Sequence, residues 1–303
     1  MYRNRGFIMR KHLQWVAILS AWAVVGAAHA AGIAGGYTQN FDSLGTSGTA
    51  LPTDWTAWSI TAGANGHSEW TTSINATEVG GGTAQTTLSA LLDSAITTST
   101  KSAGAFNLAH AATSTDRTLA TSPTGNDGVA LQLTLTNNTG DAINALQISY
   151  DIDKFYDGTL QSSTTSGLPL GEELPGYQLF FSINGGGWTN VSALNPVNTA
   201  NGSNPVVAVG IPAASGKTGS VDYAVTSITN SVFNLGTSWA AGQTLSLRWV
   251  DDNAVNVSPD QVIGLNNVSI LAAPVPEPES LALMLSGLLI VGGMARRQTP
   301  ARM

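Results

Sequence analysis

The sequence contains no cysteine and has little positive charge or histidine. The absence of cysteine excludes a disulfide framework and thiolate chemistry. Between residues 31 and 274, five Lys and Arg stand against seventeen Asp and Glu, which gives this segment a net charge of −12. Such a surface repels nucleic acid, so no nucleic-acid partner is expected. Outside residues 1–30 the histidines are His67 and His110, and neither stands in a motif of a zinc or serine hydrolase.

The chain between residues 37 and 273 also lacks a long amphipathic helical pattern. Apolar residues instead alternate with polar or small ones in segments at 129–135, 146–152, 177–183 and 245–249. Turns rich in Gly and Asn separate these segments. The pattern predicts an all-β fold, an antiparallel β-sandwich of jelly-roll type, as one domain over residues 31–274. The tryptophans of this domain are expected in the core or at its rim.

One strand near the end of this domain changes its alternation. Ile263 and Leu265 follow one parity, whereas Val268 and Ile270 follow the other. Because successive side chains of a strand point to opposite faces, an extra residue is needed between the two pairs. The sequence therefore predicts a β-bulge at Asn266–Asn267.

The N-terminus has the three parts of a secretory signal peptide. Arg10 and Lys11 precede an apolar stretch over residues 13–28, and Ala28 and Ala30 supply the small residues of a cleavage site. We expect residues 1–30 to form a signal helix that is removed after Ala30. An N-terminal membrane anchor is the alternative.

The C-terminus carries an apolar run that is expected to form a transmembrane helix over residues 280–295. At ~1.5 Å per residue such a helix spans roughly 24 Å, which is marginal for a ~30 Å hydrocarbon core. Arg296 and Arg297 follow it, which favours a cytoplasmic end. The residues before it are Val275, Pro276, Glu277 and Pro278. An ordinary tail anchor is the alternative, but such anchors need no Pro-Glu-Pro box.

This ending, over residues 275–303, resembles the PEP-CTERM sorting signal of exosortase substrates. The resemblance implies a Gram-negative bacterium, transient insertion in the inner membrane, and an exosortase that recognises and removes the tail. The protein would then reach the cell envelope or the extracellular matrix of a biofilm. The tail is sometimes labelled an ice-binding protein C-terminal domain. It is a sorting signal, however, and the label does not imply ice binding. Stretches such as "NFDSLGTSGTALPTDW" and "LFFSINGGGWTNVSAL" resemble secreted bacterial jelly-roll modules.

Acidic residues near the first and last strands form a candidate calcium site, because first and last strands commonly pair in sandwiches. Carboxylate and amide oxygens suit Ca²⁺, which is the cofactor considered for this chain. A solvated acidic loop is the alternative, since no complete calcium-loop spacing is present. The candidate ligands are Asp42, Asp251, Asp252, Asn253 and Asp260.

A second candidate site is a sugar-binding platform on one face of the sheet. Asp151 and Asp153 share a strand face, and neighbouring strands are expected to add Gln178, Phe180 and Arg248. Phe180 is predicted to be exposed and to stack on a sugar ring. Two carboxylates could also serve glycoside cleavage. An ordinary polar outer face is the alternative.

Together these observations predict an exported, non-enzymatic protein that acts as a structural or glycan-binding component and has extracellular polysaccharide as its partner. A secreted glycan-active hydrolase or lyase is the alternative, and it would require a cleft with two convergent carboxylates. An ice-binding protein would require a regular threonine face, and the threonines here follow no fixed repeat.

Overall fold

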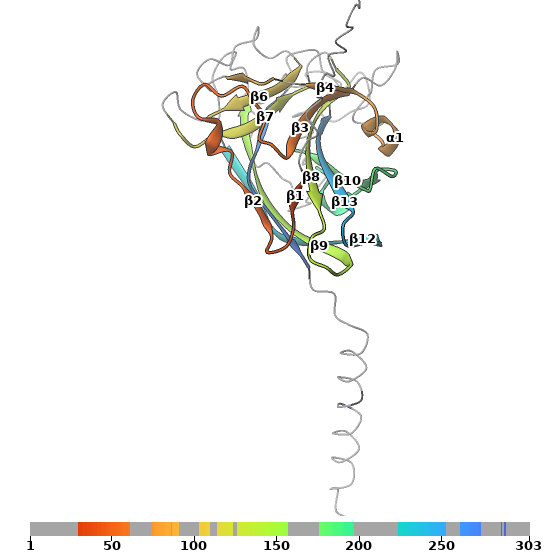
Figure 1. The fold of residues 1–303 in the computed structure, drawn as a ribbon. Helices are drawn as coiled ribbons and strands as arrows, with labels where there is room; N and C mark the ends of the chain where they lie inside the picture. The colour runs from red at the N-terminus through yellow and green to blue at the C-terminus, as the bar shows by residue number, and fades with distance from the viewer. Residues whose placement is uncertain are drawn as a thin grey trace, which may run out of the picture.

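The computed structural model describes residues 30–60, 74–85, 87–90, 103–109, 114–123, 126–156, 176–196, 224–252 and 261–273, with Ser286 and Leu288. These residues form two β-sheets packed face to face (Figure 1). The all-β sandwich expected from the sequence is therefore confirmed. The predicted signal helix and the predicted helix over 280–295 lie outside the described residues, apart from Ala30, Ser286 and Leu288.

The first sheet, sheet A, has seven strands within the described ranges. They are β1 (Ala31–Gly32), β3 (Trp55–Ile60), β4 (Thr83–Gln85), β8 (Gly128–Thr136), β10 (Gln178–Ile183), β11 (Thr189–Asn190) and β13 (Thr244–Asp252). Their order is β11-β10-β13-β8-β3-β4, and β1 pairs with β8 in parallel. The long neighbours β10, β13, β8 and β3 are antiparallel.

The second sheet, sheet B, also has seven strands in the part of the chain that the structure describes. They are β2 (Tyr37–Gln39), β5 (Ser89–Ala90), β6 (Gly104–Leu108), β7 (Thr118–Ser122), β9 (Ile143–Tyr156), β12 (Ala224–Trp239) and β14 (Val262–Ala272). Their order is β12-β9-β14-β7-β6-β5, and β2 pairs with β14. From β7 to β10, and again from β12 to β14, each consecutive strand lies in the opposite sheet.

The space between the sheets is filled by the apolar side chains of the alternating segments, which form β8, β9, β10 and β13 as predicted. Trp55 and Trp249 stack there with ring centroids 5.5 Å apart, and Tyr150 meets Trp249 edge-on at 5.9 Å. Trp55 Nε1 donates a hydrogen bond to the Tyr37 hydroxyl at 2.7 Å. These aromatic rings contribute much of the buried area that a chain without disulfides depends on.

The bulge predicted in the last strand is confirmed. The pairing of β14 with β9 shifts register between Asn266 and Ser269. Asn267 has a φ of 48°, in the left-handed region that asparagine tolerates better than most residues. The shift allows Leu265 and Val268 both to face the core.

A short helix, α1 (Ala76–Val79), covers part of the outer side of sheet A (Figure 1). Asn75 begins it with a capping box, in which its side chain accepts from the backbone of Glu78 while the Glu78 carboxylate accepts from the Asn75 amide at 2.8 Å. The helix brings Val79 onto Phe180 and Val250 of the sheet. The described residues also include the 3₁₀ turns η1 (Asp42–Leu44) and η3 (Ser192–Leu194).

Candidate functional site

The strongest candidate site lies on the outer side of sheet A beside α1, where the guanidinium of one arginine lies over the rings of two tryptophans. The guanidinium carbon of Arg248 is 4.4 Å from the ring centre of Trp58 and 4.5 Å from that of Trp188. Both indoles are half-buried, whereas Arg248 is buried. We call these three side chains the Trp–Arg–Trp cluster.

Strand alternation places this cluster outside the core. On β13, Leu247 and Trp249 point into the sandwich, so Arg248 between them points outward. Trp58 of β3 has the outward parity for the same reason. Trp188 follows the glycine-rich turn after β10, where Gly185 adopts a φ of 71°, and this turn brings the indole back over the sheet.

Arg248 also ties the end of α1 to the sheet. Its Nε donates to Gln132 Oε1 at 2.7 Å, and its Nη1 donates to the carbonyl oxygens of Val79 and, at 3.5 Å, Gly81. The two ring faces add cation–π attraction. Burial lowers the pKa of Arg248 to about 10, so the guanidinium still carries its proton at neutral pH.

Among the described residues, no acidic side chain neutralises the charge of Arg248. In the part of the chain that the structure describes, no carboxylate pairs with Arg248, and its Nη2 has no hydrogen-bond partner. Leaving a buried charge without a counter-ion is costly, and such charges are normally paired. Neutral oxygens and two indole faces therefore stabilise the guanidinium without cancelling its charge.

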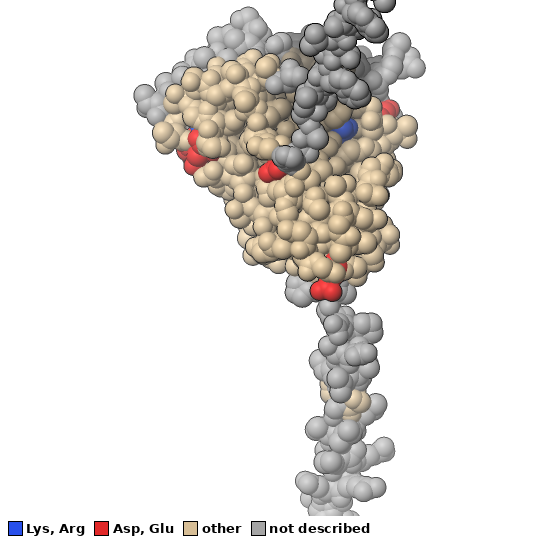
Figure 2. All heavy atoms as spheres, viewed as in Figure 1, with Lys and Arg blue, Asp and Glu red and all other residues tan. Residues whose placement is uncertain are grey.

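A strip of small polar side chains continues from the cluster along the outer side of sheet A. Thr56, Gln132, Thr134 and Ser246 are half-buried there. Gln132 Nε2 donates to Thr134 Oγ1 at 3.2 Å and to Ser246 Oγ at 3.4 Å. Hydroxyl and amide groups next to aromatic rings are a combination that recognises polyhydroxylated ligands. The face in Figure 2 carries little charge, with a small basic area near α1 and a few separate acidic ones.

The platform predicted from the sequence is not assembled. Asp151 and Asp153 belong to β9 of sheet B, whereas Gln178, Phe180 and Arg248 belong to sheet A. Because both groups point away from the core, they lie on opposite outer sides of the sandwich. The expectation that they share one face is therefore wrong.

Phe180 is also not the exposed stacking ring that was predicted. Its side chain is 1% exposed and packs against Ile60, Val79 and Val250 beneath α1. Gln178 is likewise buried, and its Nε2 donates to Asp252 Oδ2 at 2.8 Å. The prediction that the Phe180 side chain points away from the core is confirmed. Helix α1, which is far away in the sequence, covers this side chain.

Asp153 is the most perturbed carboxyl group of sheet B. Thr118 Oγ1 donates to its Oδ2 at 2.5 Å, and Asn266 Nδ2 donates to the same oxygen at 3.3 Å. Burial raises the pKa of Asp153 to about 6, although these two hydrogen bonds work in the opposite direction. The nearby charges of Asp151 and Asp116 raise it further. Thr118 and Asn266 bind its carboxyl group, and the residue is 2% exposed, so Asp153 is poorly placed to reach a substrate.

Asp42 and Asp251 bind opposite ends of one strand segment. Asp42 Oδ1 accepts from the Arg117 amide at 3.0 Å, and Asp251 Oδ2 accepts from Thr121 Oγ1 at 2.6 Å. Thr121 is four positions after Arg117, which corresponds to roughly 13 Å of extended chain. The expectation that Asp42 joins Asp251 in one calcium site is therefore wrong.

The remaining predicted calcium ligands do not restore the site. Asp252 Oδ2 accepts from the Ile74 amide at 2.9 Å, in addition to Gln178. Asn253 and Asp260 lie outside the described residues. Within the ranges that the structure describes, no three acidic or histidine side chains are grouped to hold a metal ion.

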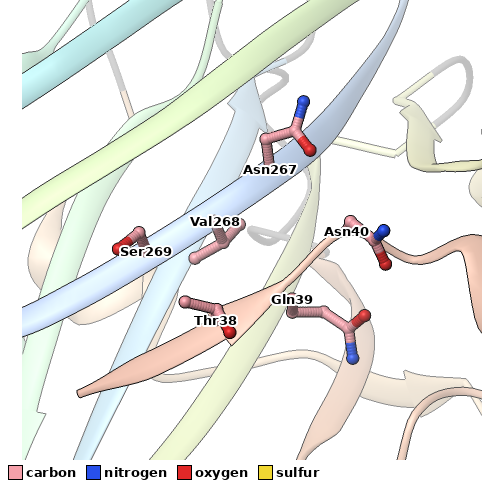
Figure 3. Close-up of a pocket in the computed structure, with 6 residues that line it drawn as sticks. All are labelled: Thr38, Gln39, Asn40, Asn267, Val268 and Ser269. Carbon is pink, nitrogen blue, oxygen red and sulfur yellow. The ribbon is translucent and has the colours of Figure 1, made fainter. Parts of the chain in front are cut away.

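A shallow groove of about 450 Å³ lies between β2 and β14, next to the bulge (Figure 3). Its lining consists of Thr38, Gln39, Asn40, Asn267, Val268 and Ser269. Asn267 Nδ2 is engaged with Asp151 Oδ2 at 2.8 Å. The lining contains neither an aromatic ring nor a charged side chain, so the groove is a weaker candidate than the Trp–Arg–Trp cluster.

Sequence reasoning missed the two tryptophans of the cluster because it assigned all tryptophans of the domain to core or rim packing. The alternation of β3, in which Trp55 and Ala57 face inward, was the signal that could have placed Trp58 outside. For Trp188, the signal was its position directly after three glycines. No local pattern indicates that the two indoles meet across Arg248.

The predicted processing residues fall almost entirely outside the described residues. This holds for Ala28, for the segment 275–278 and for Arg296 and Arg297, whereas Ala30 is described just before β1. Among the helices in the described ranges, none is long and apolar enough to cross a membrane.

Comparison with known proteins identifies no family. No family model and no curated protein matches the chain. Among solved structures, a similar one is the native structure of a family 35 carbohydrate-binding module from Clostridium thermocellum, with 8% sequence identity and a TM-score of 0.21. The match covers 51% of this chain and 78% of the module. Similarity at this level identifies neither the fold nor the ligand of this chain.

Proposed function

We propose that this chain is an exported, non-enzymatic protein whose β-sandwich binds extracellular polysaccharide through the Trp–Arg–Trp cluster. The observation that carries the proposal is the pair of half-buried indoles, Trp58 and Trp188, beside a strip of hydroxyl and amide groups. Indole faces stack on the apolar faces of sugar rings, and the strip supplies hydrogen bonds to sugar hydroxyls. The site needs no catalytic group.

Export and sorting are part of the same proposal. The N-terminal segment 1–30 supports secretion, and the tail over 275–303 supports recognition by an exosortase after transient insertion in the inner membrane. The protein would then reside in the cell envelope or the exopolysaccharide matrix, as a structural or glycan-binding component. The alternation of consecutive strands between the sheets supports a sandwich of jelly-roll type.

A glycan-active hydrolase or lyase remains the second candidate, and one observation favours it. Asp153 has a pKa raised to about 6 by burial and lies two residues from Asp151 on the same strand face, as an acid and a second carboxylate would. Its carboxyl group is engaged by Thr118 and Asn266 and is shielded from solvent. The half-buried indoles on sheet A therefore favour binding over cleavage.

A combined glycan-array and hydrolysis screen of the purified chain tests the proposal, with and without Ca²⁺. The expected result is binding of one or more polysaccharides without release of shorter products. Product release that Asp153→Asn abolishes would overturn the non-enzymatic proposal in favour of the second candidate. Absence of any binding would reject both.

A further inference from the structure

We propose that the Trp–Arg–Trp cluster selects polysaccharides that carry a carboxylate, with Arg248 as the group that receives it. This inference rests on the proposed function and specifies the ligand class of the same site. It predicts that the sugar in contact with Arg248 is acidic, such as a uronic acid. Neutral sugars on either side would lie over Trp58, Trp188 and the polar strip.

Arg248 lacks an acidic counter-ion among the described residues. The sequence from 31 to 274 has seventeen acidic residues and only five basic ones, so an acidic partner for a buried guanidinium would be easy to supply. Arg248 is nevertheless 3% exposed with no paired carboxylate in the described residues. A negatively charged group on the ligand would neutralise the charge of Arg248 and would form a charge-assisted hydrogen bond with it.

Within the described part of the chain, the hydrogen bonds of the guanidinium leave one of its nitrogens unused. Nε is used by Gln132 and Nη1 by the carbonyl oxygens of Val79 and Gly81. These bonds fix the plane of the group and leave Nη2 without a partner among the described residues. The guanidinium carbon also lies over the rings of Trp58 and Trp188, so Nη2 is the nitrogen that can donate to an incoming oxygen.

The charge of the whole domain narrows the ligand class further. A net charge of −12 over residues 31–274 repels a polymer that carries a charge on every sugar. One cationic group with a single unused nitrogen accommodates one carboxylate. The preferred ligand is therefore a mostly neutral polysaccharide with isolated acidic sugars.

A purely structural role for Arg248 makes a different prediction. If the arginine served only to tie α1 to the sheet, a carboxylate on the glycan would bring no advantage. Replacing Arg248 would then weaken neutral and acidic glycans equally, through displacement of Val79 and the two indoles. The comparison of matched glycans separates the two roles.

The test measures binding of the purified full chain to matched pairs of oligosaccharides on several neutral backbones. Each backbone, such as xylotetraose or cellotetraose, is offered without a charge, with one glucuronic acid branch, and with that branch as its methyl ester. The expected result is a preference for the free acid on the order of 10- to 100-fold over the other two. Arg248→Met should abolish this preference, so that the variant binds the free acid and the methyl ester with equal affinity.

The outcomes distinguish failure of this inference from failure of the proposed function. Equal binding of free acid and methyl ester by the unmodified protein overturns the role of Arg248 and leaves glycan binding intact. Binding of no glycan in any form overturns both. If Arg248→Met fails to fold, the comparison of acid and ester on the unmodified protein still decides the question, because it needs no variant.

Discussion

Replacement of the buried carboxyl group by Asp153→Asn should stabilise the protein above pH 6. A pKa of about 6 against an ordinary value of 3.8 makes the charged form of Asp153 about 3 kcal/mol less favourable in the folded protein than in the unfolded chain. The stability contributed by the protonated group is fully present below pH 3.8 and is lost as the pH rises through 6. The amide oxygen of asparagine can still accept from Thr118 and Asn266, so the change removes the charge and keeps these contacts.

Urea unfolding of the two proteins between pH 4 and pH 8 provides the measurement. The free energy of unfolding of the variant should exceed that of the unmodified protein by roughly 1 to 3 kcal/mol at pH 8, and the difference should vanish towards pH 4. Asp151→Asn is the matched control, because Asp151 lies on the same strand face but is half-exposed, and its effect should stay within about 0.5 kcal/mol. A destabilised Asp153→Asn at pH 8 would refute the reasoning.

The burial of two aromatic rings, the separation of Asp42 from Asp251 and the C-terminal segment 275–303 each lead to a further prediction. Phe180→Ala and Tyr150→Ala should each lower the free energy of unfolding by about 3 to 5 kcal/mol, because both rings are buried; a loss below 1 kcal/mol in urea unfolding would contradict their placement. Millimolar Ca²⁺ should leave the melting temperature unchanged, because Asp42 and Asp251 do not converge; a rise of several degrees would reveal a calcium site. Intact-mass analysis of released protein should show that the segment 275–303 is gone, and its retention would argue against exosortase processing.

Strands and the bulge could be predicted from the sequence because both depend on local periodicity. In β13, Leu245, Leu247 and Trp249 alternate with outward residues, and all three are buried in the core. The parity change across Asn266–Asn267 likewise follows from the need to bury Leu265 and Val268. These features need only the rule that apolar side chains share one face of a strand.

The site could not be predicted in the same way because it depends on which strands become neighbours. Phe180 and Asp153 both point outward, as alternation indicated, but they belong to different sheets. Alternation also says nothing about what covers an outer face, and Val79 of α1 buries Phe180. The meeting of Trp58 with Trp188 across Arg248 joins three segments that are far apart in the sequence.

Glycan binding by Trp188→Ala, compared with the unmodified protein, tests the assignment of the binding face most directly. Isothermal titration with the best ligand from the glycan array should show a loss of about 1 to 3 kcal/mol, or roughly 5- to 150-fold in Kd. Leu271→Ala is the matched control, since it removes an exposed apolar side chain from sheet B, and it should leave Kd unchanged. Unchanged affinity in Trp188→Ala, or an equal loss in Leu271→Ala, would contradict a binding face on sheet A.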